Sequence, residues 1–212
     1  MGHHHPDHDH VRLQGGWLML LLAPANLLVE DMATKILEKY DKALSDELEA
    51  GLDWYWAASG LAEGFAERHN RTHAQASGII AALSPRERWE RNLVYADEFM
   101  GGGFPPTLTR SVGWAMDIDD GKDPRQVLRG PKTRAFFENI LNPEFPFVTV
   151  DGWAAGIAAG QRLNQKQRSQ MLNRKGGYER VASAYRIAAA MRRVLPCQMQ
   201  AVTWVVERGS AT

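Results

Sequence analysis

Apolar side chains recur every three to four residues along most of the chain from Met32 onward, and no run alternates Val, Ile or Thr with polar residues. Spacing of three to four marks helices that bury one face, whereas strict alternation marks strands. The clearest helical patterns span residues 36–48, 54–65 and 76–83, and the last is apolar on every side. The sequence therefore predicts an all-α protein.

Proline, glycine and capping residues divide the rest of the chain. The tetrapeptide Ser84-Pro85-Arg86-Glu87 has the N-cap, the first-turn proline and the capping-box acid of a helix, so we expect a helix to begin there. The glycine and proline run at residues 101–106 predicts a loop. Further helices are expected at residues 108–117, 123–128, 131–141, 151–159, 177–194 and 198–207.

Residues 1–31 differ in character from residues 32–212. Five of the seven histidines lie within the first ten residues, and the apolar run from Trp17 to Val29 is only 13 residues long and contains Pro24. A membrane-spanning helix needs about 20 apolar residues. We expect residues 1–31 to be a leader, disordered or weakly helical, with a signal peptide as the alternative. Residues 32–212 are expected to form one soluble, monomeric domain without membrane contact.

The charges cancel overall but are unevenly distributed. The 25 basic and 25 acidic side chains give no net charge, so attraction to nucleic acid does not follow from the total. Residues 1–121 nevertheless carry 10 basic and 19 acidic side chains, and residues 122–212 carry 15 and 6. Residues 161–193 contain nine basic side chains and a single acidic one, Glu179. This pattern favours a surface that tracks phosphates over a merely solvated face.

The cysteine and histidine content restricts the metal and redox chemistry. A single cysteine, Cys197, excludes an intramolecular disulfide and a four-cysteine zinc or iron–sulfur site, and it fits a reducing cytoplasm. His69 and His73 are four residues apart, but no third ligand is apparent. We therefore expect no metal and no other cofactor.

The most informative stretch runs from Val127 to Gly160. It contains Gly-Pro-Lys-Thr at residues 130–133 and Val-Asp at residues 150–151, with 19 positions from Lys132 to Asp151. Here the chain resembles the helix-hairpin-helix DNA glycosylase superfamily, in which a Gly-x-Lys-Thr hairpin starts one helix and a Val-Asp step starts the next. It is similar in particular to glycosylase-like proteins of phages and bacteria that pair an ALSP..RWERN helix with GPKT..F..NI and VTVD.W.

The resemblance extends over residues 53–207. It implies a helical glycosylase-like domain with Lys132 and Asp151 at the mouth of a central cleft, and duplex DNA with a flipped base as the partner. It also implies an N-glycosylase that excises a modified or damaged base. Two positions depart from the family pattern, because Leu128 replaces the first hairpin glycine and Trp153 stands where many relatives carry histidine.

Elementary chemistry supports roles for these two residues, Lys132 and Asp151. A lysine in the first turn of a helix feels the positive end of the helix dipole, and partial burial would further favour the neutral, nucleophilic amine. We expect Lys132 to attack the anomeric carbon and to give lyase activity through a Schiff base. A carboxylate that opens a helix is stabilised by backbone N–H groups. Asp151 is therefore expected to stabilise the oxocarbenium-like charge as the glycosidic bond breaks.

Neighbouring residues are assigned to DNA contacts. Backbone N–H groups at Gly130, together with Thr133 and Arg134, are expected to hold a phosphate at the start of a helix. Arg174 and Lys175 are expected to contact further phosphates.

The substrate pocket is assigned to Trp153, Arg88, Trp89 and Asn92. Trp153 is expected to stack on the extruded base. The other three belong to a cluster at residues 86–92 that either faces the substrate or forms a salt-bridged surface turn. Four residues near the C-terminus could also reach a pocket, although a closing amphipathic helix is the favoured interpretation: Gln198, Gln200, Thr203 and Trp204.

Structural alternatives remain open at this stage. Gly-Pro-Lys-Thr begins many helices, and an aspartate before Gly-Trp-Ala-Ala is a common N-cap. The same fold would then serve a DNA-binding protein without catalysis. A third hypothesis is an enzyme that hypermodifies DNA bases.

Overall fold

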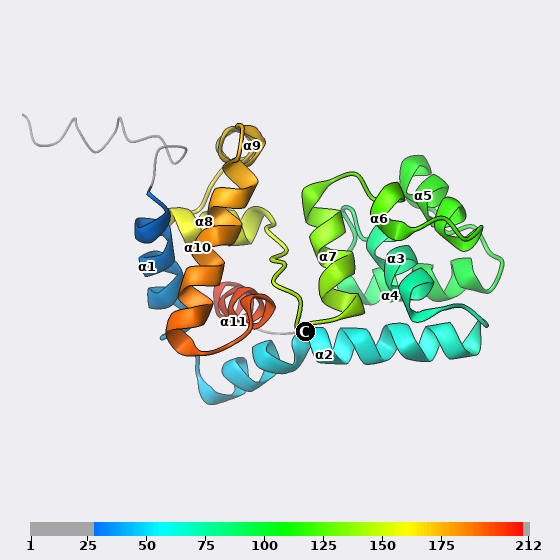
Figure 1. The fold of residues 1–212 in the computed structure, drawn as a ribbon, viewed down its shortest axis with the longest axis horizontal. Coiled ribbons are helices and arrows are strands. Elements are labelled where there is room, and N and C mark those ends of the chain that lie inside the picture. The colour runs from blue at the N-terminus through cyan, green and yellow to red at the C-terminus, as the bar shows by residue number, and fades with distance from the viewer. Residues whose placement is uncertain (1–27, 210–212) are drawn as a thin grey trace, which may run out of the picture.

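The computed structural model describes residues 28–209, and all regular elements in this range are helices. The prediction of an all-α protein is therefore confirmed. In chain order the helices are α1 (Val29–Tyr40), α2 (Ser45–Arg68), α3 (His73–Leu83), α4 (Trp89–Met100), α5 (Thr109–Asp119), α6 (Pro124–Val127), α7 (Pro131–Leu141), α8 (Gly152–Ala159), α9 (Gln165–Asn173), α10 (Gly177–Arg192) and α11 (Pro196–Arg208). Figure 1 shows their arrangement.

The helices form two lobes, each with its own cluster of buried hydrophobic side chains (Figure 1). One cluster draws on α2 to α7, together with Cys197 and Ala201 of α11, and includes Ile79 and Phe137. The other draws on α1 and α8 to α11 and includes Ile36 and Tyr185. The sequence predicts one domain, and the structure divides the core of that domain in two.

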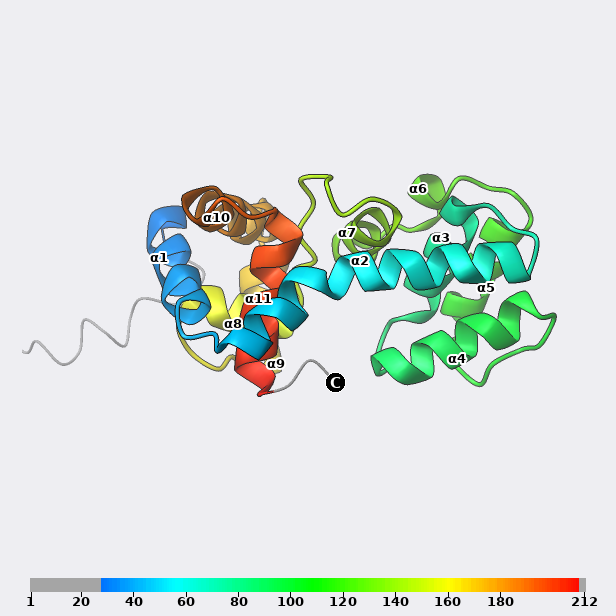
Figure 2. The same cartoon turned by 90° about the horizontal axis from the view of Figure 1, so that it is seen from below.

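Helix α2 joins the lobes. Its 24 residues extend about 36 Å at 1.5 Å per residue, and Figure 2 shows it crossing beneath both lobes. Its N-terminal half packs against α11, and its C-terminal half packs against α3 and α7. At Gly51 a Cβ would lie only 2.5 Å from Val202 Cα. The close approach of α2 to α11 therefore requires glycine at this position.

Several predicted helices are confirmed with their caps. The helix expected at residues 131–141 has those bounds as α7. Asp123 caps α6 by accepting a hydrogen bond from Arg125 N at 2.9 Å, and Asp151 caps α8. Arg125 also donates to both carboxylate oxygens of the buried Glu138 at 2.9 Å, which fixes α6 against α7.

The helix predicted to begin at Ser84 is wrong. Ser84 instead ends α3, where its hydroxyl donates to Ala81 O at 2.9 Å, and α4 begins only at Trp89. Between them Arg86 has φ of 72°, a left-handed conformation that no α-helix accommodates. The local signals at Ser84 and Pro85 are overridden by a turn.

Two further boundaries differ from the prediction. The apolar positions at residues 36–48 belong to two helices, because the chain turns at residues 41–44, and Leu48 lies on the same helix as Trp54. Helix α9 was not predicted, since only Met171 of its residues is buried and its sequence shows no apolar stripe.

The start of α1 modifies the predicted leader. Residues 29–31 form the first turn of α1, and Met32 and Ala33 in the next positions are buried, so the boundary placed at Met32 falls inside a helix. The remainder of the predicted leader, residues 1–27, lies outside the described residues. None of the helices described here is long and apolar enough to cross a membrane.

Candidate functional site

A cavity of about 250 Å³ lies where the two lobes meet, and we call it the central cavity. Its walls come from α2, α4 and α7 on one side and from α8, α11 and the segment before α8 on the other. It collects all six residues that the sequence assigns to catalysis or to the substrate pocket: Arg88, Trp89, Asn92, Lys132, Asp151 and Trp153. The structure thus brings these residues together, while their roles stay predictions.

Asp151 is held by the first turn of α8. Its Oδ1 accepts hydrogen bonds from the backbone N–H groups of Trp153 at 2.9 Å and Ala154 at 2.8 Å. Within residues 28–209 no hydrogen bond engages Oδ2. One carboxylate oxygen therefore fixes the side chain, and the other is available to a ligand in the cavity.

The extended segment before Asp151 is tied to both lobes. The Tyr178 hydroxyl of α10 donates to Val148 O at 2.8 Å and accepts from Val150 N at 3.0 Å. From the opposite lobe, Asn139 Nδ2 of α7 donates to Thr149 Oγ1 at 3.1 Å. Burial raises the pKa of Tyr178, so its hydroxyl keeps the proton that the first bond needs. Sequence reasoning missed both Tyr178 and Asn139.

Lys132 lies in the first turn of α7 and is exposed. The partial burial that the sequence argument considered is absent, since the side chain is exposed to water. No ion pair joins Lys132 to another described residue. The ammonium group is therefore free to meet an anion or a substrate at the cavity.

Aromatic side chains line much of the central cavity. The ring centroid of Trp54 lies 5.1 Å from that of Trp89, 6.1 Å from Phe136 and 6.4 Å from Trp204. The Arg208 guanidinium lies 4.5 Å from the ring centroid of Trp204. Flat apolar walls of this kind suit a flat, aromatic ligand.

Polar groups lie among these rings. Tyr55, which burial keeps protonated by raising its pKa, donates to Gln200 Oε1 at 2.9 Å. Asn92 is 1% exposed. Gln200 and Trp204 lie on α11, the predicted closing helix, and both also line the cavity, which is the alternative that the sequence left open. A glutamine amid the apolar positions of α11 was the available signal.

The cluster at residues 86–92 combines both of its predicted alternatives. Glu87 and Arg91 form an ion pair at 3.7 Å, as a salt-bridged turn would. Arg88, Trp89 and Asn92 line the central cavity, as a substrate-facing cluster would.

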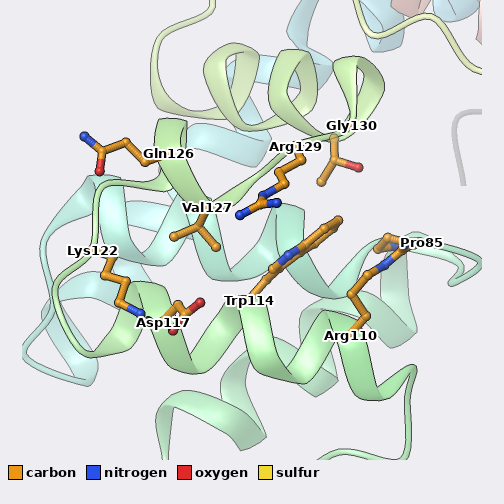
Figure 3. Close-up of a pocket in the computed structure, with 10 residues that line it drawn as sticks. Pro85, Arg110, Trp114, Asp117, Lys122, Gln126, Val127, Arg129 and Gly130 are labelled. Atoms are coloured by element: carbon orange, nitrogen blue, oxygen red, sulfur yellow. Dashed lines mark hydrogen bonds and ion pairs between the residues drawn. The ribbon is translucent and has the colours of Figure 1, made fainter.

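A second and larger cavity of about 760 Å³ lies on the other side of the first turn of α7 (Figure 3). We call it the cationic cavity, because Arg110, Lys122 and Arg129 line it. Figure 3 shows Arg129 and Trp114 pointing into the same space, and the Arg110 guanidinium lies 5.1 Å from the Trp114 ring centroid. Lys122 is paired with Asp117 at 2.6 Å.

The predicted DNA contacts divide between this cavity and other surfaces. Gly130 and Thr133 line the cationic cavity. Arg134 is exposed on α7, and Arg174 and Lys175 are exposed at the turn between α9 and α10, so these three line neither cavity.

The chain shows a family relationship. Residues 21–211 match DUF7178, which is described as a family of unknown function. The chain belongs to the DUF7178 family. Curated proteins and solved structures gave no match. The DUF7178 region begins at residue 21, so part of the predicted leader lies within the sequence shared by the family.

The hairpin of this DUF7178 protein differs from the two-glycine pattern. Leu128, at the position of the first glycine, is 1% exposed and belongs to the core of its lobe. Gly130 has φ of −80°, which any residue adopts. An anion at this hairpin would therefore meet the N–H groups at the start of α7 rather than a left-handed glycine turn.

Part of the basic segment at residues 161–193 is engaged within the DUF7178 protein. Arg186 pairs with Glu179, and Arg192 pairs with Asp41. The Arg162 guanidinium lies 5.4 Å from the Trp153 ring centroid. The segment thus offers fewer cations to phosphates than its composition predicts.

Other reactive side chains of the protein are committed to structural contacts. Cys197 is buried, its thiol donates to Pro143 O at 3.2 Å, and burial raises its pKa to about 12. His69 contacts Asp97 at 2.8 Å. Over the described range no three His, Cys, Asp or Glu side chains gather as metal ligands would.

Proposed function

We propose that this DUF7178 protein is a DNA N-glycosylase of the helix-hairpin-helix type, which flips a modified or damaged base into the central cavity and breaks its glycosidic bond. The observation that carries the proposal is the meeting of Lys132 and Asp151 in one cavity lined by tryptophans. These two residues begin separate helices and form the motif that resembles DNA glycosylases.

In the proposed reaction the bond between C1′ and the base nitrogen breaks, and its electron pair leaves with the base, which takes up a proton. The Oδ2 atom of Asp151 faces the positive charge that develops on the sugar, which a fixed negative group stabilises. Water then adds to C1′ and releases a proton. The exposure of Lys132 favours water over its amine as this nucleophile.

The central cavity suits an extruded base in size and character. Its volume of about 250 Å³ is below the roughly 300–1,000 Å³ of sites for drug-sized molecules, so it favours a small ligand. The rings of Trp54, Trp89 and Phe136 provide stacking surfaces for a flipped base. The cationic cavity and the N–H groups at the start of α7 lie beside it, where they would meet the phosphates that flank the base.

The decisive experiment is incubation of the full chain with DNA from several sources of modified bases, with released bases identified by mass spectrometry. We expect release of at least one base. If no base is released and DNA still binds, the non-catalytic DNA-binding function replaces this proposal. A base that is altered while it stays attached to DNA would instead support the hypermodification hypothesis.

Replacing Lys132 by Gln should separate base release from lyase chemistry. Because the exposed amine is the group that would form a Schiff base, Lys132→Gln should abolish any adduct trapped by borohydride while base release falls less than about tenfold. Lys42→Gln removes an exposed cation in the turn between α1 and α2 and serves as the control. A loss of base release in parallel with trapping would show that the lysine, rather than water, attacks the sugar.

Charge reversal in the cationic cavity should weaken DNA binding without regard to sequence. Each phosphate contact contributes about 0.9 to the slope of log K against log salt concentration. We expect Arg129→Glu to reduce that slope by about 1 in fluorescence anisotropy titrations. Lys42→Glu, in the turn between α1 and α2, should leave it unchanged. Equal effects of the two variants would mean that the cationic cavity is not a DNA contact.

A further inference from the structure

Asn92 combines nearly complete burial with a carboxamide that has no partner. Its side chain is 1% exposed, and neither Nδ2 nor Oδ1 has a hydrogen-bond partner in the described part of the chain. Buried polar groups are almost always hydrogen-bonded, because an unsatisfied one costs as much as its lost contact with water. The described groups of the protein therefore satisfy neither the donor nor the acceptor of this amide.

The position of Asn92 distinguishes it from the other buried polar groups that lack a partner. Ser77 Oγ and Thr107 Oγ1 have no partner either, but neither residue lines the central cavity. Asn139 lacks a partner only at Oδ1, since its Nδ2 donates to Thr149. Among the described residues, Asn92 alone places an unpaired donor and an unpaired acceptor together at the wall of that cavity.

The shape of the site specifies what can satisfy the amide. A carboxamide presents one donor and one acceptor side by side in a plane, and its complement is an acceptor and a donor side by side in a flat molecule. The edges of nucleobases have this pattern, which is why Asn and Gln pair with adenine through two hydrogen bonds. Trp89 lies one turn before Asn92 on α4, and the Trp54 ring lies against the Trp89 ring. A flat ligand that stacks on these rings would therefore bring its edge to the Asn92 amide.

We propose that Asn92 is the base-reading residue of the central cavity and accepts only bases with an unblocked pair of neighbouring donor and acceptor groups. This inference rests on the proposed function, because it assigns specificity within the same cavity. It predicts that modifications on the paired edge exclude a base from the site. Modifications on the other edges of the ring are not read by Asn92.

The test is direct binding of base analogues, followed by the fluorescence of the tryptophans that line the cavity. The probes are 1-methyluracil, 1-methylcytosine, 9-methyladenine and 9-methylguanine, whose methyl group stands for the sugar. Each is compared with a counterpart whose donors beside a ring or carbonyl acceptor are methylated: 1,3-dimethyluracil, N4,N4-dimethyl-1-methylcytosine, N6,N6-dimethyl-9-methyladenine and N2,N2-dimethyl-1,9-dimethylguanine. We expect saturable quenching by at least one unblocked probe and binding about 10-fold to 100-fold weaker for its blocked counterpart.

Two variants assign the effect to Asn92. Asn92→Leu keeps the branching and the number of side-chain heavy atoms and removes both polar functions, and Asn92→Asp replaces the donor with a second acceptor. Both should bind the preferred probe at least about 10-fold more weakly, and Asn92→Leu should no longer distinguish it from its blocked counterpart. Ser77→Ala, which removes a buried partnerless hydroxyl outside the cavity, should bind as the wild type does. Thermal melting of each variant shows that the fold persists.

Each outcome decides the inference. Absence of quenching by every probe, or wild-type discrimination in Asn92→Leu, would overturn it. The proposed glycosylase function fails by a different result, namely that no base is released from DNA. Binding of free base analogues without release from DNA would retain Asn92 as the reader of the base and reject excision. If DNA bases are released and Asn92→Leu changes neither the rate nor the selectivity of release, excision is retained and the base-reading role of Asn92 is rejected.

Discussion

Replacing Asp151 by Asn should lower the rate of base release by at least about 100-fold while the protein stays folded. Asparagine is as good an N-cap as aspartate, so Trp153 and Ala154 keep their hydrogen-bond acceptor. What is lost is the negative charge near the sugar, and removing one electrostatic contact to a transition state typically costs about 10²-fold to 10³-fold in rate. Single-turnover kinetics on a substrate from the modified-base panel, together with thermal melting, measures both quantities.

The chain offers a matched control for this variant. Asp123 caps α6 in the same way, through Arg125 N, but it does not line the central cavity. Asp123→Asn should therefore melt like Asp151→Asn and release bases like the wild type. If the two variants have the same rate, Asp151 is only a helix cap, and the catalytic assignment is wrong.

Replacing Gly51 by Ala should destabilise the protein by about 3 kcal/mol, the upper range for forcing an extra methyl group into a packed interior. The new Cβ would lie 2.5 Å from Val202 Cα and 2.7 Å from Val202 N. These are backbone atoms, so the strain is relieved only if α2 and α11 move apart. At this chain length the melting temperature should fall by roughly 6–12 °C in a calorimetric or circular dichroism melt.

Gly60→Ala on the same helix is the control. A Cβ there would meet no atom within 4 Å, and alanine favours a helix by about 1 kcal/mol over glycine. This variant should melt above the wild type. Because Trp54 and Gln200 lie on the two helices that Gly51→Ala separates, that variant should also bind base analogues more weakly. A wild-type melting temperature for Gly51→Ala would contradict the close packing of α2 on α11.

Most helix starts could be predicted from the sequence, because capping and turn residues act on a backbone only a few positions away. Asp123 and Asp151 mark helix starts through their own side chains, and the structure confirms both caps. Ser84 carries the same kind of signal and fails, since the left-handed Arg86 turns the chain before α4 begins. Helix α9 also begins with a capping box, formed by Asn164 and Gln167, but it was not predicted because it buries only Met171 and shows no apolar stripe.

The non-local part was accessible only through the resemblance, which places Lys132 and Asp151 at one cleft. Their local signals alone do not bring them together, because their meeting in one cavity depends on how two lobes join. Trp54, Tyr55 and Gln200 have no motif, and their place in the cavity results from the packing of α2 on α11. A pattern of apolar positions shows that such residues face inward, but it does not show which of them border a space.

The double anchoring of the segment before Asp151 has a mechanical consequence. Tyr178 holds it from one lobe and Asn139 holds it from the other, whereas the Asp151 carboxylate itself is fixed to α8 and Lys132 lies on α7 of the opposite lobe. A ligand that draws the lobes together or spreads them would displace Asp151 relative to Lys132. In the proposed reaction, the separation of Lys132 and Asp151 would therefore depend on the distance between the two lobes.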